Sequence, residues 1–289
     1  MTDVSLEATR SSGLQAEGPS RARLVDSVRG LPSWVVAGFG VVVIVAVWEV
    51  VSLWFSPAGN GSVPAPWRTV AYLVESLTTP VTWNAIAQTS ASAGLGYLWG
   101  NAIALVLAFV VLVLPVTESL ATQLAVVASC IPLTAIGPIV ALMSPAGSRV
   151  TSVFLAALSV IFTTTVGALL GLRSASSTQL DVIRAYGGSR LTELRKVRLI
   201  AAAPSLLAAF KIAAPAAFLG AVLGEYFLIG VDSGLGLQLV AASATNTSLQ
   251  IWSIALISAG IAGLAYFLIG LIGRLVTPWA GDGAGKGMA

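Results

Sequence analysis

The stretch WVVAGFGVVVIVAVWEVVSLWF, residues 34–55, decides the fold class of this chain. Its 22 residues contain a single charged side chain, Glu49, and no proline. A helix of this length rises roughly 33 Å at about 1.5 Å per residue, which is enough to cross the hydrocarbon layer of a membrane. The run is too long for the apolar core of a signal peptide, and no small-residue cleavage pattern follows it. The sequence therefore predicts a membrane-spanning helix.

The composition of the whole chain extends this prediction. Of the 289 residues, 56% are apolar and only 9% are charged, against about 25% charged residues in a typical soluble domain. So few charges cannot cover a water-exposed surface, so most of the outer surface faces lipid. Five further apolar runs span residues 86–114, 120–142, 150–172, 204–230 and 250–275. We predict an all-α integral membrane protein with six spans and a membrane domain over 32–280.

The predicted third span, residues 120–142, carries two prolines, Pro132 and Pro138. Proline removes a backbone donor and bends or breaks a helix, so we expect this span to be kinked or partly re-entrant. Backbone groups freed at membrane depth are tolerated only inside protein or along an aqueous cavity. Pro132, Ala135 and Pro138 are therefore candidates for a solute path.

The positions of lysine and arginine predict the orientation. With both termini in the cytoplasm, twelve of the fifteen basic residues lie on the cytoplasmic side, as membrane insertion favours. Residues 1–31 and 281–289 are then cytoplasmic tails. This placement favours membrane orientation over nucleic-acid binding as the reason for the basic balance. The two predicted external basic residues are Arg68 and Arg149, while Lys211 lies within a span.

Several kinds of chemistry are excluded by what the chain lacks. It has one cysteine, Cys130, and no histidine, which argues against an intrachain disulfide and against a zinc or haem site. It has no Gly-x-x-x-x-Gly-Lys-Ser/Thr loop, so it cannot hydrolyse ATP alone. We expect a protein that is not an enzyme by itself and that binds no cofactor in this chain.

The loop at residues 173–203 is long, predicted to be cytoplasmic, and patterned. The run TQLD (178–181) resembles a capping box and begins a first helix. Gly187 and Gly188 stop that helix, and a second helix is expected over 189–199. The apolar positions of the first helix are Leu180, Ile183 and Tyr186. The resulting helix–glycine–helix elbow, residues 175–199, suits a groove on a cytoplasmic partner. The alternative is a basic amphipathic loop lying on the anionic inner leaflet.

Three short runs in and around the elbow resemble a known signature. GLRS (171–174), DVIRAYG (181–187) and VRL (197–199) are similar to the EAA signature of permease subunits of ABC importers. Asp181 stands for the glutamate of the signature and Gly187 for its glycine. Val182 and Ile183 replace its two alanines, and Ile200 replaces its proline. The spacing of the signature is intact.

The resemblance extends over residues 30–280 and is nearest to the nitrate, sulfonate and taurine importer branch. VPAP (63–66), the Pro132–Pro138 run, and Gly224-Glu225 followed by Gly234-Leu235-Gly236 match motifs of that branch. This chain departs from the branch at two positions: Ser92 stands where the branch has an arginine, and Pro145 where it has a glycine.

This resemblance implies a type I ABC importer permease fold in a bacterial inner membrane, with the elbow as cytoplasmic coupling helix. Its implied partners are a second permease copy forming a homodimer, an ATPase subunit dimer that binds ATP, and an extracytoplasmic solute-binding protein. The solute would be small: a sulfonate, nitrate, taurine or a thiamine-precursor-like compound. Asp181 and Gly187 would fix the shape of the elbow. The residues implied to pack into or pair with the ATPase subunit are Tyr186, Leu191, Leu194 and Arg184.

Three ionisable residues fall within the predicted spans, where a charge is costly and is by default a functional hypothesis. Lys211 is expected to snorkel to the cytoplasmic face, and Glu49 to hydrogen-bond to a neighbouring span. For Glu225, a gating or docking role and a structural hydrogen bond both remain open. The competing class is a secondary carrier driven by an ion gradient. Such carriers often contain two inverted halves, and this chain shows no such repeat.

Overall fold

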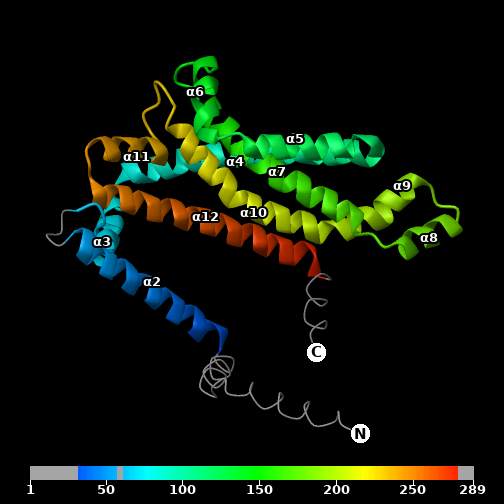
Figure 1. The fold of residues 1–289 in the computed structure, drawn as a ribbon, viewed down its shortest axis with the longest axis horizontal. Helices are drawn as coiled ribbons and strands as arrows, with labels where there is room; N and C mark the ends of the chain where they lie inside the picture. Colours follow the sequence, from blue (N-terminus) through cyan, green and yellow to red (C-terminus); the bar gives the residue numbers. More distant parts are fainter. Residues whose placement is uncertain (1–31, 57–60, 279–289) are drawn as a thin grey trace, which may run out of the picture. The chain divides into compact units, whose positions relative to one another are not determined.

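The computed structural model describes residues 32–56 and 61–278, in which all regular secondary structure is helical (Figure 1). The predicted tails at 1–31 and 281–289 lie outside the described residues. The chain divides after Pro66 into two compact units. Each unit is described by itself.

The first unit contains α2 (Ser33–Phe55), which begins one residue before the predicted span. The exposed side chains of this helix are mostly valine, isoleucine and leucine, as expected of a helix surrounded by lipid. The chain then folds back on the end of α2. Ser56 Oγ donates to the Val63 carbonyl at 2.8 Å, and Trp48 Nε1 donates to the Pro64 carbonyl at 3.1 Å.

The second unit holds the remaining helices. In chain order they are α3 (Pro66–Ser76), α4 (Pro80–Val113), the 3₁₀ turn η1 (Pro115–Thr117), α5 (Glu118–Cys130), α6 (Leu133–Met143), α7 (Val150–Arg173), α8 (Ser177–Ala185), α9 (Arg190–Glu193), the π-helical turn η2 (Leu194–Arg198), α10 (Leu199–Glu225), α11 (Leu235–Ala244) and α12 (Ser248–Val276).

Within the described ranges, five helices are long and apolar enough to cross a membrane: α2, α4, α7, α10 with the turn before it, and α12. The predicted third span, 120–142, instead forms two helices, α5 and α6. They are 13 and 11 residues long, or about 20 and 16 Å, so neither alone crosses a layer of about 30 Å. The break lies at Ile131 and Pro132, which are both extended, because proline disfavours helical geometry in the residue before it. The predicted kink is thus a complete break.

Two other predicted boundaries are wrong by several residues. The span predicted at 86–114 begins at Pro80, because a proline in the first turn of a helix sacrifices no intrahelical bond. The span predicted at 204–230 is shifted towards the N-terminus and covers Leu199–Glu225, with Pro204 inside the helix. The loop after it contains Gly230 at φ +72°, a conformation that ends helices.

The core of the second unit is built on α7, which packs against α4 on one side and α10 on the other (Figure 1). Small residues form both seams. A Cβ atom on Gly96 would lie 2.7 Å from the Val153 carbonyl oxygen, and one on Gly220 would lie 2.7 Å from the Leu155 carbonyl oxygen. Gly100 and Gly224 approach α7 equally closely. Each pair has the Gly-x-x-x-Gly spacing that lets two helices approach closely, and here both approaches occur within the chain.

Buried hydrogen bonds cross the same seams. Ser152 Oγ on α7 donates to the Ala221 carbonyl on α10 at 2.9 Å. Thr164 Oγ1 on α7 donates to Asn101 Oδ1 on α4 at 2.7 Å. A polar group buried in a membrane protein cannot hydrogen-bond to water, so it must bond within the protein. These bonds therefore fix the register of α7 against α4 and α10.

Candidate functional site

Two groups of polar residues lie at opposite ends of α7 and α10. The elbow follows the C-terminal end of α7 and precedes α10. The second group, which we call the Glu225 node, comprises Thr89, Arg149, Glu225 and the backbone of Ser233–Gly236. It lies where α7 begins and α10 ends. The 24 residues of α7 separate the two groups by about 36 Å, which is close to the thickness of a bilayer.

Hydrogen bonds of Ser174 hold together the two chain segments at the base of the elbow, the end of α7 and the start of α10. Ser174 Oγ donates to the Gly171 carbonyl at 2.7 Å and to the Ala201 carbonyl at 2.9 Å. Beside it, a Cβ atom on Gly171 would lie 2.9 Å from the Ala202 carbonyl oxygen. The chain therefore leaves the helix bundle and re-enters it at one point, and the elbow projects between the two.

The first elbow helix, α8, is capped by Ser176. The Gln179 backbone N–H donates to Ser176 Oγ at 3.2 Å, and the Ser176 N–H donates to Gln179 Oε1 at 3.3 Å. The capping box predicted at 178–181 is therefore two residues out of register. Ser176 is extended directly after α7, so the earlier of two overlapping capping patterns is the one formed. Asp181 is thus not a capping residue.

Gly187 ends α8 as the sequence predicted. Its φ of +70° lies in the left-handed region. The Gly188 N–H donates to the Ile183 carbonyl at 2.8 Å, and the Gly187 N–H donates to the Arg184 carbonyl at 2.9 Å. These two bonds form a Schellman motif, which glycine at this position permits at least cost.

An ion-pair network joins the two arms of the elbow. Arg184 Nε donates to Glu193 Oε1 at 2.8 Å, and Arg184 Nη1 donates to Asp181 Oδ1 at 3.3 Å. The hydrogen bond to Glu193 and its charge raise the pKa of Arg184 above its ordinary value. Arg184 therefore has carboxylate partners within its own chain, and its pairing with carboxylates of another subunit stays a prediction.

The second elbow helix is not a separate element, which corrects the helix predicted at 189–199. A single run of helix extends from Leu191 to Glu225 over 35 residues, with η2 as a π-helical turn inside it. Among the other predicted contact residues, Tyr186 is 89% exposed at the turn after α8 and Leu191 is 54% exposed, while Leu194 is half-buried.

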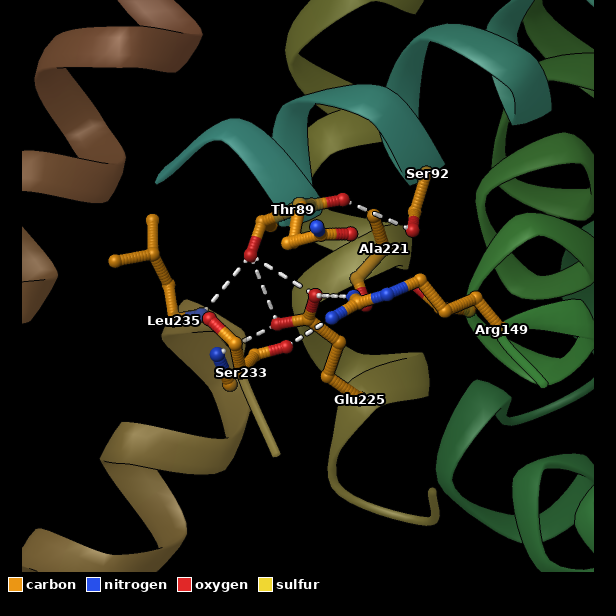
Figure 2. Close-up of polar contacts among 10 residues, drawn as sticks. Thr89, Ser92, Arg149, Ala221, Glu225, Ser233 and Leu235 are labelled. Carbon is orange, nitrogen blue, oxygen red and sulfur yellow. Dashed lines mark hydrogen bonds and ion pairs between the residues drawn. The ribbon is translucent and has the colours of Figure 1, made fainter. Parts of the chain in front are cut away.

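At the other end, the Glu225 side chain is fully buried. Thr89 Oγ1 on α4 donates to its two carboxylate oxygens, at 2.9 and 3.0 Å, and the Gly236 backbone N–H donates to Oε2 at 2.8 Å. Arg149 Nη1 donates to Oε1 at 3.0 Å (Figure 2). The carboxylate is therefore paired and hydrogen-bonded, as a buried charge must be.

The node also fixes the loop that follows α10. Figure 2 shows Ser233 and Leu235 beside the carboxylate: Arg149 Nη2 donates to the Ser233 carbonyl, and the Leu235 N–H donates to Thr89 Oγ1 at 2.9 Å. A Cβ atom on Gly234 would lie 2.6 Å from the Glu225 carboxylate. The node thus joins α4, α7, α10 and α11.

Sequence reasoning identified Glu225 but missed two of its partners, Thr89 and Arg149. Arg149 was counted only as an external charge. The sequence did contain one signal. Arg149 stands at the start of one predicted span, and Glu225 lies near the end of the next. Because consecutive spans are antiparallel, these two ends lie at the same membrane face.

The predicted pathway residues lie on α6 and the break before it. Pro132, Ala135 and Pro138 are exposed, while Gly137 is buried and a Cβ atom on it would lie 2.3 Å from the Phe227 ring. Pro132, Ala135 and Pro138 are spaced three residues apart and therefore lie towards one side of α6.

Of the two other ionisable residues within spans, Lys211 has an aromatic partner. Its Nζ lies 4.2 Å from the centroid of the Tyr266 ring on α12, a cation–π contact. The Tyr266 side chain is 43% exposed, and the snorkelling of Lys211 stays a prediction. Glu49 is half-buried on α2, and its bond to a neighbouring span stays a prediction.

Comparison with known proteins identifies the family. Residues 100–281, which make up 182 of the 289 residues, match the family described as binding-protein-dependent transport system inner membrane component. A probable ABC transporter permease protein of Haemophilus influenzae is 31% identical over 175 residues, which are 61% of this chain and 69% of that protein. The matched region includes the elbow, the α5–α6 break and Glu225. The chain therefore belongs to the family of inner-membrane components of binding-protein-dependent transport systems, as an ABC transporter permease subunit.

Proposed function

We propose that this permease subunit forms, with a second copy of itself, the solute pathway of an ATP-driven importer. A cytoplasmic ATPase subunit dimer binds ATP and engages the elbow, and an extracytoplasmic binding protein delivers the solute. Both termini face the cytoplasm. ATP-binding-cassette systems of this family pair a permease with ATPase and binding-protein partners in general; the direction of transport and the role of the elbow are the proposal.

One observation supports the coupling role: the second arm of the elbow continues without a break into a span that ends at the Glu225 node. Ser174 hydrogen-bonds across the base of the elbow, and the Schellman motif at Gly187 forms its turn. An ion pair from Arg184 to Glu193 joins its two arms. No loop intervenes between Leu191 and Glu225. A displacement of the elbow by a closing ATPase dimer is therefore carried along α10 to the opposite membrane face.

The helix order supports six crossings. The Thr89 end of α4 lies at the node, so α4 ends at the elbow face, whereas α7 begins at the node with Arg149. The chain between them must return across the membrane, and α5 and α6 together are the segment that does so. In this proposal the third span is a broken one, and the exposed Pro132, Ala135 and Pro138 face the solute or the second permease copy.

The solute class rests on sequence resemblance to the nitrate, sulfonate and taurine importer branch. The proposed cargo is a small sulfonate, nitrate, taurine or a thiamine-precursor-like compound. The external binding protein selects it, and the pore passes what is delivered.

Site-directed cross-linking tests the coupling role and the orientation together. Cys130 is replaced by serine, and single cysteines are introduced as Tyr186→Cys in the elbow and Leu142→Cys at the end of α6, where the side chain is 85% exposed. We expect Tyr186→Cys to cross-link to a co-purifying ATPase subunit and Leu142→Cys not to. In intact cells, a membrane-impermeant maleimide should label only Leu142→Cys.

The contrary results are equally clear. If no ATPase subunit co-purifies under gentle detergent conditions and uptake follows an ion gradient, the secondary carrier replaces this proposal. If the impermeant reagent labels Tyr186→Cys in intact cells, the orientation is reversed.

A further inference from the structure

A groove opens between the base of the elbow and the adjoining ends of two spans. It has a volume of about 820 Å³ and is lined by the last turns of α4 and α7, by α8 and the turn after it, and by α9 and η2. Its size is within the range of ligand-binding clefts in proteins, about 300–1,000 Å³. Three of the residues implied to contact the ATPase subunit, Arg184, Leu191 and Leu194, line its elbow side, whereas Tyr186 and the Glu225 node lie outside it.

The walls of the groove on the membrane side are apolar. They include Phe109 and Val113 on α4, which are 57% and 56% exposed, and the buried side chains of Leu169 and Leu172 on α7. Large apolar side chains left open to this extent, at the end of membrane spans, are the surface that hydrocarbon chains cover.

The elbow side of the groove is basic. Three arginines line it, Arg173, Arg184 and Arg198, against a single acidic residue, Glu193. Glu193 is already engaged by Arg184 at 2.8 Å. Arg198 is half-buried and makes no ion pair with any residue that the structure describes. An excess of positive charge therefore remains at the mouth of an apolar cleft.

We propose that the groove binds an anionic phospholipid of the cytoplasmic leaflet. Its phosphate lies at Arg198, and an acyl chain lies along Phe109, Val113 and Leu172. Basic pockets between spans on the cytoplasmic side are suited to anionic headgroups, and the guanidinium fork matches the phosphate oxygens. A soluble anion would use the arginines but leave the apolar walls in water, so the occupant must be amphiphilic.

The position of this lipid would let it influence how the elbow moves the spans. It lies between the elbow and the spans that the elbow moves, so the lipid composition of the inner leaflet sets how firmly the elbow is held. The inference rests on the proposed cytoplasmic orientation of the elbow, which the maleimide labelling tests separately.

The test measures which lipids stay bound to the full-length chain. The protein is placed in nanodiscs of mixed phosphatidylcholine and phosphatidylglycerol, released, and examined by native mass spectrometry for retained lipid. We expect retained phosphatidylglycerol to exceed phosphatidylcholine, and Arg198→Gln to lower this preference about fivefold, as loss of one basic contact to an anionic lipid does. Arg195→Gln is the matched control: it removes the same charge from the same turn at an exposed position outside the groove.

A second variant tests the apolar half. Val113→Trp fills the groove without changing its charge and should lower total lipid retention. Equal phosphatidylglycerol preference in Arg198→Gln and Arg195→Gln would mean that surface charge alone attracts the lipid and would overturn the proposal. Displacement of the lipid by inorganic phosphate would overturn its amphiphilic basis. Loss of the lipid when the ATPase subunit is bound would assign the groove to that protein interface instead.

Discussion

The Thr89 hydroxyl donates to both oxygens of the buried Glu225 carboxylate, at 2.9 and 3.0 Å, although the two residues are 136 positions apart in the chain. The same Thr89 oxygen accepts the Leu235 N–H at 2.9 Å. A single side chain on α4 thereby holds the end of α10 and the start of α11. The first prediction follows from this double role.

Thr89→Val keeps the shape of the side chain but removes its hydroxyl. The carboxylate then loses a donor and the buried Leu235 N–H loses its acceptor, so we expect the free energy of unfolding to fall by about 2 kcal/mol. Thermal unfolding of the purified chain in detergent measures the change. Thr122→Val is the control, because Thr122 is exposed on α5. Equal melting of both variants would show that the Thr89 bonds contribute nothing to stability.

Arg149 and Glu225 should behave as a coupled pair, since their side chains approach to 3.0 Å and Glu225 is fully buried. Arg149→Gln leaves a buried carboxylate without its ion-pair partner, a change that typically costs about 3–5 kcal/mol in a protein interior. We expect the additional change Glu225→Gln to restore part of that loss. A double-mutant cycle on thermal stability measures the coupling, and additive effects would contradict the pairing.

The seam between α7 and α10 should not tolerate a side chain at Gly220. Its Cβ atom would lie 2.7 Å from the Leu155 carbonyl oxygen and 2.8 Å from the Ala156 Cα, which are backbone atoms that cannot move aside singly. We expect Gly220→Val to lower the free energy of unfolding by roughly 1–3 kcal/mol, as overpacking does. Gly263→Val on α12, where no atom lies within 4 Å of the added Cβ, is the control. Both variants are compared by the yield of folded protein and its melting temperature.

Gly187 should be required for its backbone conformation, since nothing lies within 4 Å of an added Cβ there and φ is +70°. We expect Gly187→Val to leave membrane insertion intact but to lower solute-stimulated ATP hydrolysis by the assembled transporter several-fold. Gly187→Asn should retain more activity, because asparagine accepts left-handed geometry more readily than valine. If valine and asparagine variants hydrolyse ATP at the normal stimulated rate, the elbow does not couple the two subunits through this turn.

Properties that depend on long apolar runs could be predicted from the sequence. The runs at 34–55, 150–172 and 250–275 match α2, α7 and α12 within two residues at each end. The run at 120–142 could not be assigned fully, because hydropathy does not distinguish a bent span from two helices. Only the two extended residues at Ile131 and Pro132 decide between them.

Site residues could be predicted where neighbouring residues in the sequence determine the local structure. They could not be predicted where a contact with a distant part of the chain determines it. Gly187 could be predicted as a helix stop because glycine is favoured at such positions. The cap of α8 was misplaced because Ser176 and Thr178 both begin acceptable capping patterns, and the end of α7 selects between them. Arg149 was missed since its partner lies 76 residues away, and no periodicity in the sequence connects the two.

The π-helical turn at Leu194–Arg198 has a consequence for how such a chain can vary in length. A π-turn accommodates one residue more than an α-turn while the helix continues on both sides. Loss of one residue here would therefore turn the π-turn into an ordinary α-turn and leave Lys211, Pro215 and Glu225 facing the same neighbours. The elbow and the span that follows it can then differ in length independently of each other.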